Sequence, residues 1–296
     1  MTSWSGYTSI LTTVVELSGE HTRRWCNGMF SNNFRSMKAH QYHRSAICDD
    51  RGRVQGFIDA LCVSDTQFIC SFDGITLEDF NGRFQMYMML DDIELEECSN
   101  NICHIFGEEA TVLLDTLGLP TPEKEEAVVH NGLWIVQRSR LNGHDGFDIL
   151  SSTENNTALD SIVERLRSQG TATTTDQFED LRILSGTPRF PIDFTDKSFI
   201  HDYNLQDDVC SFNKGCYVGQ EIINRMDIKK LATKKLLRIR LDGSWSIGEE
   251  LLLEGKKSGI VTSVTSDGTV GLALLRKTAW EMGTVLTSSK GSATVI

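Results

Sequence analysis

Lys214-Gly215-Cys216-Tyr217-Val218-Gly219-Gln220-Glu221, followed by Ile222-Ile223-Asn224-Arg225, is the stretch of this chain in which chemically capable side chains are most concentrated. A lysine and a thiol lie two positions apart, and two glycines bracket Cys216-Tyr217-Val218. After Gly219 the apolar residues recur at helical spacing, which predicts a helix. Glu221 and Arg225 are then spaced to pair across one turn.

The position of Cys216 predicts an activated thiol. It precedes a predicted helix N-terminus, where unpaired backbone N–H groups and the helix dipole favour negative charge. Lys214 adds a nearby cation. The helix N-terminus and the lysine should therefore both lower the pKa of the Cys216 thiol and favour the thiolate. A helix cap with a small buried cysteine is an equally open interpretation. Likewise, Glu221 and Arg225 either contact a ligand or form a surface ion pair worth about 0.2–0.5 kcal/mol.

Length and composition indicate a globular protein. With 296 residues, 40% hydrophobic content and 4 prolines, we expect two or three domains. Apolar runs long enough to span a membrane are absent, and the N-terminus resembles neither a secretory nor a mitochondrial presequence. We therefore expect a cytoplasmic protein without a membrane partner. The 8 cysteines form no Cys-x-x-Cys pair, which predicts reduced thiols and no zinc site.

The charge is negative overall but unevenly distributed. A net charge of −12 argues against nucleic acid as a partner, since phosphate binding requires a basic face. Residues 214–240 nevertheless hold eight basic residues and only two acidic ones. This basic island either receives an anionic ligand or an acidic partner, or is an ordinary solvated face.

Strands and helices alternate along the chain without the long parallel array of a nucleotide-binding fold. We expect a hairpin over 43–63 around Asp49-Asp50-Arg51-Gly52, a helix capped by Thr76, strands at 93–97 and 102–106, and an irregular segment over 186–213. After Lys235, short strands separated by glycines indicate a small β-barrel. The pattern predicts an α+β fold with antiparallel sheets.

The stretch 214–221 with Arg225 resembles the signature of YgfZ-type proteins, which belong to the glycine-cleavage T-protein (aminomethyltransferase) superfamily. Four further segments resemble the family in order and spacing: Asp49–Val54, Leu181–Ile183 with Gly186-Thr187-Pro188, Gly259–Val264 and Leu272–Arg276. The resemblance covers most of the chain.

The resemblance implies two ferredoxin-like subdomains over residues 1–230 and a C-terminal β-barrel over 231–296, arranged around a central channel that binds tetrahydrofolate. It also implies a role with iron–sulfur assembly proteins or client enzymes, with Cys216 as the acting thiol and the protein as a monomer. The residues implied to bind folate are Lys214, Gly215, Tyr217, Gly219, Gln220, Glu221 and Arg225. A single cysteine cannot hold a cluster alone, so any cluster contact would be shared.

Departures from the family pattern favour an accessory protein over a transferase. Where T-proteins carry an aspartate after the first hairpin, this chain has Gln55-Gly56, and Asp59 comes a few residues later. Leu184 stands where many members have a glutamate that contacts the pterin. Ser31-Asn32-Asn33 replaces Thr-Asn-Asp. A folate-dependent aminomethyltransferase or demethylase is the alternative, and a folate-sensing scaffold with a structural Cys216 is a third.

Overall fold

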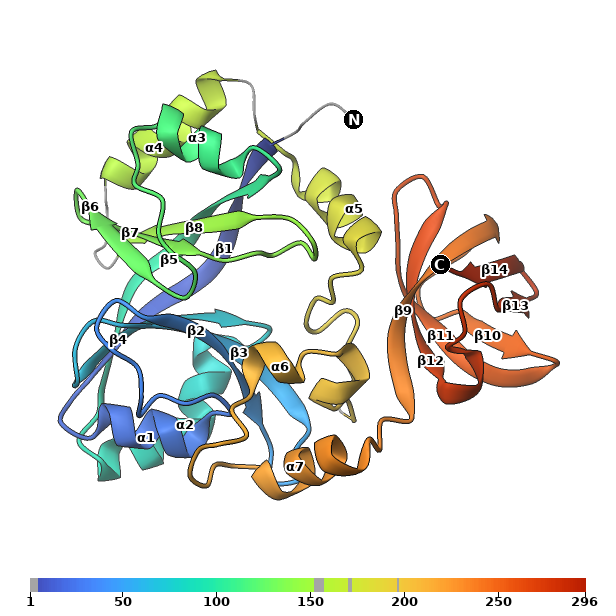
Figure 1. Ribbon diagram of the computed structural model, residues 1–296, viewed down its shortest axis with the longest axis horizontal. Coiled ribbons are helices and arrows are strands. Elements are labelled where there is room, and N and C mark those ends of the chain that lie inside the picture. Colours follow the sequence, from blue (N-terminus) through green and yellow to red (C-terminus); the bar gives the residue numbers. More distant parts are fainter. Residues whose placement is uncertain (1–4, 152–156, 170–171, 196) are drawn as a thin grey trace.

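Two long, paired strands lie at the centre of the main sheet. The computed structural model describes residues 5–151, 157–169, 172–195 and 197–296. Strands β1 (Ser5–Ser18) and β5 (Glu94–Gly107) pair antiparallel along their whole lengths. They lie at the centre of an eight-stranded sheet with the order β2-β3-β4-β1-β5-β8-β7-β6. Both halves of the sheet therefore share the same two central strands (Figure 1).

The first half of the sheet comprises β2 (Tyr42–Cys48), β3 (Val54–Cys62) and β4 (Gln67–Asp73). Helices α1 (Thr22–Met29) and α2 (Leu77–Leu90) cover it. The Thr76 side chain accepts a hydrogen bond from the Asp79 amide and so begins α2. Phe80, Phe84 and Met88 recur at helical spacing and pack with the buried side chains of the sheet. Burial of each such aromatic ring contributes about 1.5–3 kcal/mol.

The second half repeats this arrangement. Its strands are β6 (Ala127–His130), β7 (Leu133–Gln137) and β8 (Gly146–Ser151), and its helices are α3 (Ala110–Thr116) and α4 (Thr157–Ser168). A separate apolar core forms between these helices and the sheet. The sheet curls, and its two edges approach each other. At this point Gln41, just before β2, forms an antiparallel β-bridge with Glu126, just before β6. The predicted α+β class is confirmed.

Strand β5 differs from the sequence prediction. The separate strands expected at 93–97 and 102–106 are one continuous strand. A polar stretch, Ser99-Asn100-Asn101, divides the two apolar runs, and two separate strands were therefore expected. Pairing with β1 continues past it with two register shifts, so the ladder of backbone hydrogen bonds outweighs the local preference.

Helix α5 (Thr175–Ser185) leads from the sheet to the barrel. It begins with a capping box between Thr174 and Gln177 and ends at Gly186, whose φ of 73° suits a residue without a Cβ atom. The segment expected to be irregular contains two short elements, η1 (Ile200–Tyr203) and α6 (Gln206–Val209). The helix predicted after Gly219 is α7 (Gln220–Lys229).

The C-terminal part is a closed barrel with the strand order β10-β11-β12-β9-β14-β13, as the glycine-punctuated pattern predicted. Its strands are β9 (Lys234–Gly243), β10 (Glu250–Leu253), β11 (Lys256–Val264), β12 (Val270–Arg276), β13 (Val285–Ser288) and β14 (Gly291–Val295), with η2 (Lys277–Ala279) after β12. Within the described residues, no helix is long and apolar enough to cross a membrane.

Candidate functional site

A cavity of about 800 Å³ lies between the sheet, α5 and the segments on either side of η1. Its lining comes from β1, β2, β3, the end of β4, the loop after β7, α5, residues 187–190, and Leu205, Asp208 and Val209. These segments surround the middle of the molecule (Figure 1). The volume falls within the range of about 300–1,000 Å³ that is typical of ligand pockets.

Aromatic rings and arginines dominate the chemistry of this cavity. The aromatic residues that line it are Tyr42, Phe57, Phe72, Phe178 and Phe190, and the arginines are Arg44, Arg138, Arg140, Arg182 and Arg189. The Arg44 guanidinium lies 4.4 Å from the Phe57 ring centroid in a cation–π contact. Flat apolar walls beside fixed positive charge suit a planar ligand that carries an anionic group.

A buried ion network supports the sheet side of the cavity. Asp59 accepts from Tyr42 at 3.0 Å and pairs with Arg138 at 2.7 Å. Arg44 reaches both Asp59 at 3.3 Å and Asp73 at 2.5 Å. Burial raises the pKa of Asp59 to about 6, although Arg44 lowers it. The network thus holds the arginines in place along the cavity.

Asp148 forms the second centre of this network. It binds Arg140 at 2.7 Å and His104 at 2.8 Å. Burial alone would raise the pKa of Asp148, but Arg140 and His104 outweigh it and lower the pKa to about 2. The sequence did not predict this network, because its members come from β2, β3, β4, β5, β8 and the loop after β7. The closely spaced Arg138-Ser139-Arg140 was its one available signal.

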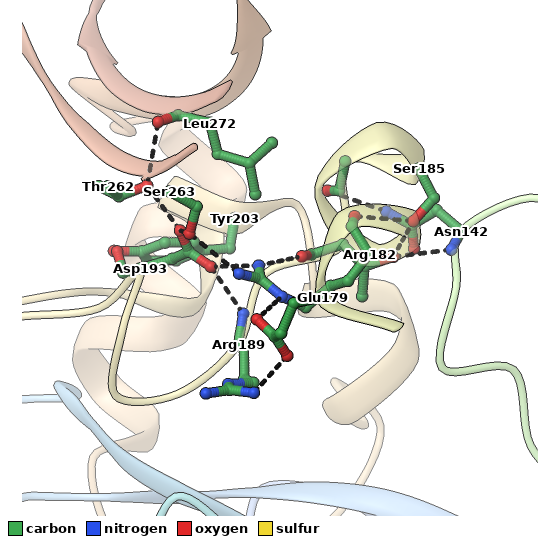
Figure 2. A network of polar contacts seen from close by, with 12 residues as sticks. Asn142, Glu179, Arg182, Ser185, Arg189, Asp193, Tyr203, Thr262, Ser263 and Leu272 are labelled. Carbon is green, nitrogen blue, oxygen red and sulfur yellow. Dashed lines mark hydrogen bonds and ion pairs between the residues drawn. The ribbon is translucent and has the colours of Figure 1, made fainter. Parts of the chain in front are cut away.

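A second network, shown in Figure 2, joins the cavity wall to the barrel. Arg182 from α5 binds Asp193 at 2.7 Å and Ser263 of β11 at 3.0 Å. Asp193 also accepts from Thr262 at 2.6 Å and from Ser263 at 2.7 Å. Glu179 of α5 binds both Arg182 and Arg189. The segment that resembled the family at 181–188 therefore attaches the barrel to the body.

The motif at 214–221 lies outside the cavity. The described residues that line the cavity include none of the candidate site residues of this motif, which are Lys214, Gly215, Cys216, Tyr217, Gly219, Gln220, Glu221 and Arg225. Tyr217 is buried in the apolar cluster that contains Phe57 and Val209. Gln220 donates to the Gly215 carbonyl at 3.4 Å. The assignment of seven of these residues to a folate site, and of Cys216 as the acting thiol, stays a prediction.

Lys214 has a structural contact that the sequence did not predict. Its ammonium donates to the carbonyls of Phe30 and Asn32, at 2.6 Å each, and lies 4.8 Å from the Tyr217 ring centroid. Burial lowers the pKa of Lys214 to about 8. The lysine thus fastens the motif to the loop after α1, which holds Ser31-Asn32-Asn33.

Of the two alternatives for Glu221 and Arg225, the surface ion pair does not form among the described residues. Glu221 and Arg225 are both exposed, and no ion pair joins them in the described part of the chain. The i,i+4 spacing allows such a pair, but two solvated side chains gain little from forming it. Both are available to solvent instead.

Cys216 differs from the other cysteines. It is exposed in the loop before α7, whereas the remaining seven cysteines are buried. Burial raises the pKa of the Cys210 thiol to about 11, which keeps it protonated. Cys216 is therefore the thiol that an external reactant or partner reaches first. No group of three or more His, Cys, Asp or Glu residues suited to a metal ion occurs among the described residues.

Comparisons with known proteins complete this description. No family model matches the chain. It is 31% identical over 114 residues to a chloroplastic protein of Arabidopsis thaliana with a provisional transferase name, a match that covers 37% of this chain and 26% of that protein. It is 21% identical over 229 residues to the tRNA-modifying protein YgfZ of Hamiltonella defensa, which covers 75% of this chain and 66% of that protein.

The fold resembles a solved structure over nearly all of the chain. The glycine cleavage system aminomethyltransferase T from Bartonella henselae superimposes with a TM-score of 0.84 at 16% sequence identity. The match covers 99% of this chain and 85% of that one. The two proteins share their architecture.

Proposed function

We propose that this chain, which is similar to a YgfZ protein over 75% of its length and shares the fold of an aminomethyltransferase T, is a YgfZ-type protein that binds tetrahydrofolate and supports the assembly or repair of iron–sulfur enzymes. The cavity of about 800 Å³ carries this proposal. Its position in the middle of the molecule agrees with the central channel that the family resemblance implies. The activity of the protein, its location in the cytoplasm and its partners are parts of the same proposal.

The residues around the cavity fit a folate. A pterin is a planar ring, and Phe57, Phe178 and Phe190 offer apolar walls to it. The glutamyl part of folate carries carboxylates, which arginines bind well. Arg189 is half-exposed and is the cavity arginine most open to such a group. When bound, the folate would supply a carrier for one-carbon units.

Calorimetric titration with tetrahydrofolate tests the cofactor. We expect saturable heat and a raised unfolding midpoint, since a ligand of the native state stabilises it. Arg189→Gln should weaken binding several-fold, whereas Arg167→Gln, an exposed arginine of α4 that does not line the cavity, should not. No heat and no thermal shift with the unaltered protein would remove folate from the proposal.

The thiol of Cys216 is the second part of the proposal. Soft thiolates suit iron–sulfur chemistry, and the exposed position of Cys216 lets a partner contribute the remaining ligands. Cells that carry only Cys216→Ala should lose activity of iron–sulfur enzymes. Asn213→Ala, at a neighbouring exposed residue, serves as the control. Undiminished activity of iron–sulfur enzymes in cells that carry only Cys216→Ala would contradict a role for this thiol.

Aminomethyl transfer is the less favoured alternative. Gln55 and Gly56 occupy the place of the transferase aspartate, and neither is among the described residues that line the cavity. Leu184, at the position of the pterin-binding glutamate, is 46% exposed and does not line it either. Formation of 5,10-methylenetetrahydrofolate from a methylamine donor would reverse this preference.

A further inference from the structure

The last two turns of α2 carry a group of exposed apolar side chains. Met86, Tyr87, Met89 and Leu90 are between 53% and 79% exposed. Met86, Met89 and Leu90 follow i, i+3, i+4 spacing and so lie on the side of the helix opposite the buried Phe84. Single exposed apolar residues are ordinary on a protein surface, but a contiguous group of them marks an interaction site.

This side of α2 is remote from the proposed folate site. The helix lies on the face of the sheet that points away from the middle of the molecule (Figure 1). None of the described residues that line the central cavity belongs to it. The exposed group therefore requires an explanation that is independent of the cavity.

Gly82 lies on the same side of α2, one turn before Met86. An added Cβ atom would meet nothing within 4 Å, so the fold itself does not require a glycine there. A glycine inside a helix costs about 0.8–1 kcal/mol relative to alanine. With Glu78 and Asp79, Gly82 lines a surface hollow of about 680 Å³ beside the first turns. A position without a side chain lets a second backbone approach closely.

The end of α2 is acidic. Asp91 caps the helix, Asp92 follows, Glu94 begins β5, and the last turn holds no basic residue. The C-terminus of a helix carries partial negative charge, so carboxylates there destabilise an isolated helix. Arg24 offsets one of them by binding Asp91 at 2.5 Å, whereas no ion pair between described residues involves Asp92 or Glu94. A cation supplied from outside the chain would relieve this repulsion.

We propose that the outer side of α2 is a docking surface for a partner protein, and that the partner presents a helix with apolar side chains on one side and lysines or arginines beside them. The apolar side chains cover Met86 and Met89, the basic ones pair with the carboxylates at the two ends of α2, and the backbones approach at Gly82. Methionine suits this role because its flexible, polarizable side chain adapts to the surface that it contacts. The docking surface depends on neither the folate nor the thiol function.

The charge of the surface selects this occupant. A second copy of the chain, docked symmetrically, would bring two acidic helix ends together, and like charges across an interface disfavour it. A basic amphipathic helix matches both the apolar and the acidic parts of the surface. With 14 residues, α2 is about 21 Å long and offers room for a partner helix of three to four turns.

Titration of the full protein into two labelled helical peptides, followed by fluorescence anisotropy, tests this surface. One peptide consists of leucine and lysine with the leucines on one side, and the other has glutamate in place of every lysine. We expect saturable binding of the lysine peptide alone. Met89→Ser and Asp92→Asn should each weaken it several-fold. Met282→Ser and Glu281→Gln, at exposed barrel residues of the same kinds, are the matched controls and should leave the affinity unchanged.

Gly82→Gln separates docking from stability. The new side chain has open space in the isolated protein, and glutamine is the better helix former, so the unfolding midpoint should stay equal or rise. The same side chain should weaken binding of the lysine peptide several-fold, because it blocks close approach of the second helix. Thermal unfolding of the other variants checks that each of them is folded.

Four results would overturn the docking surface. The first is absence of lysine-peptide binding to the unaltered protein. The second is unchanged affinity in Met89→Ser and Gly82→Gln, or an equal loss in the barrel controls, which would show a general attraction between a negative protein and a basic peptide. The third is binding to vesicles of zwitterionic lipid that Met89→Ser abolishes, which would assign the surface to a membrane. The fourth is a concentration-dependent dimer that Met89→Ser dissociates, which would assign it to a second copy.

Discussion

Gly219, at the N-terminus of α7, packs directly against Gly52 in the turn between β2 and β3. A Cβ atom added at Gly219 would lie 2.9 Å from the Gly52 Cα atom and 2.6 Å from the Asp49 carbonyl oxygen. The two stretches that most resembled the family are thus one packed unit. Their glycines are required because no larger residue fits the contact.

Substitution of Gly219 by alanine should therefore destabilise the protein. Its φ of 82° is unfavourable for residues with a Cβ atom, and the steric overlap adds to this cost. We expect a loss of about 1–3 kcal/mol in denaturant unfolding. Gly215→Ala is the control, since no atom lies within 4 Å of its added Cβ. Equal stability of both variants would contradict the packed contact.

Removal of the buried arginine in the barrel network should have a larger effect. Arg182→Met leaves Asp193 as a buried charge without its main partner. Such a loss costs about 3–5 kcal/mol in the free energy of unfolding. Arg167→Met breaks an exposed pair with Glu164 and should cost at most about 1 kcal/mol. If Arg182→Met lowered the free energy of unfolding by no more than Arg167→Met does, the network would not stabilise the fold.

Acid should destabilise the protein through His43. Burial, together with the nearby positive charge of Lys214, lowers the pKa of His43 to about 3. Between pH 6.5 and 3 the unfolded chain binds a proton that the native state does not, so stability falls as the pH falls. The unaltered protein should lose up to about 1.4 kcal/mol per pH unit more than His43→Phe below pH 6.5. Parallel pH profiles from pH 7.5 to 5 would contradict a buried neutral His43.

Thiol alkylation of the native protein should modify Cys216 first. It is exposed and the other seven cysteines are buried. We expect one adduct per chain by mass spectrometry under native conditions and eight after denaturation. Cys216→Ser should abolish the fast adduct. Rapid labelling of a second cysteine without denaturant would contradict the described burial.

Local patterns predicted most of the elements but not the cavity. The hairpin around Gly52, the Thr76 cap and the α7 helix follow from turn and capping residues close in sequence. Strands β13 and β14 were missed, because residues 283–295 are glycine- and serine-rich and carry few apolar side chains. Their pairing partners in the barrel decide their conformation.

The candidate site depends on long-range contacts that no local pattern encodes. Arg44 and Arg138 meet at Asp59 only because the sheet curls and brings its edges together. Asp208 lies in a four-residue helix inside a segment expected to be irregular. The motif containing Cys216 was the strongest chemical signal in the sequence, yet it lies outside the cavity.

The shared central strands also have a consequence for how the molecule unfolds. Because β1 and β5 run through both halves of the sheet, each half would lose part of its backbone hydrogen bonds between strands if it were separated from the other. A cut between the halves would sever two continuous strands rather than a linker. The two halves therefore form a single cooperative folding unit, and neither can be excised as an independent module.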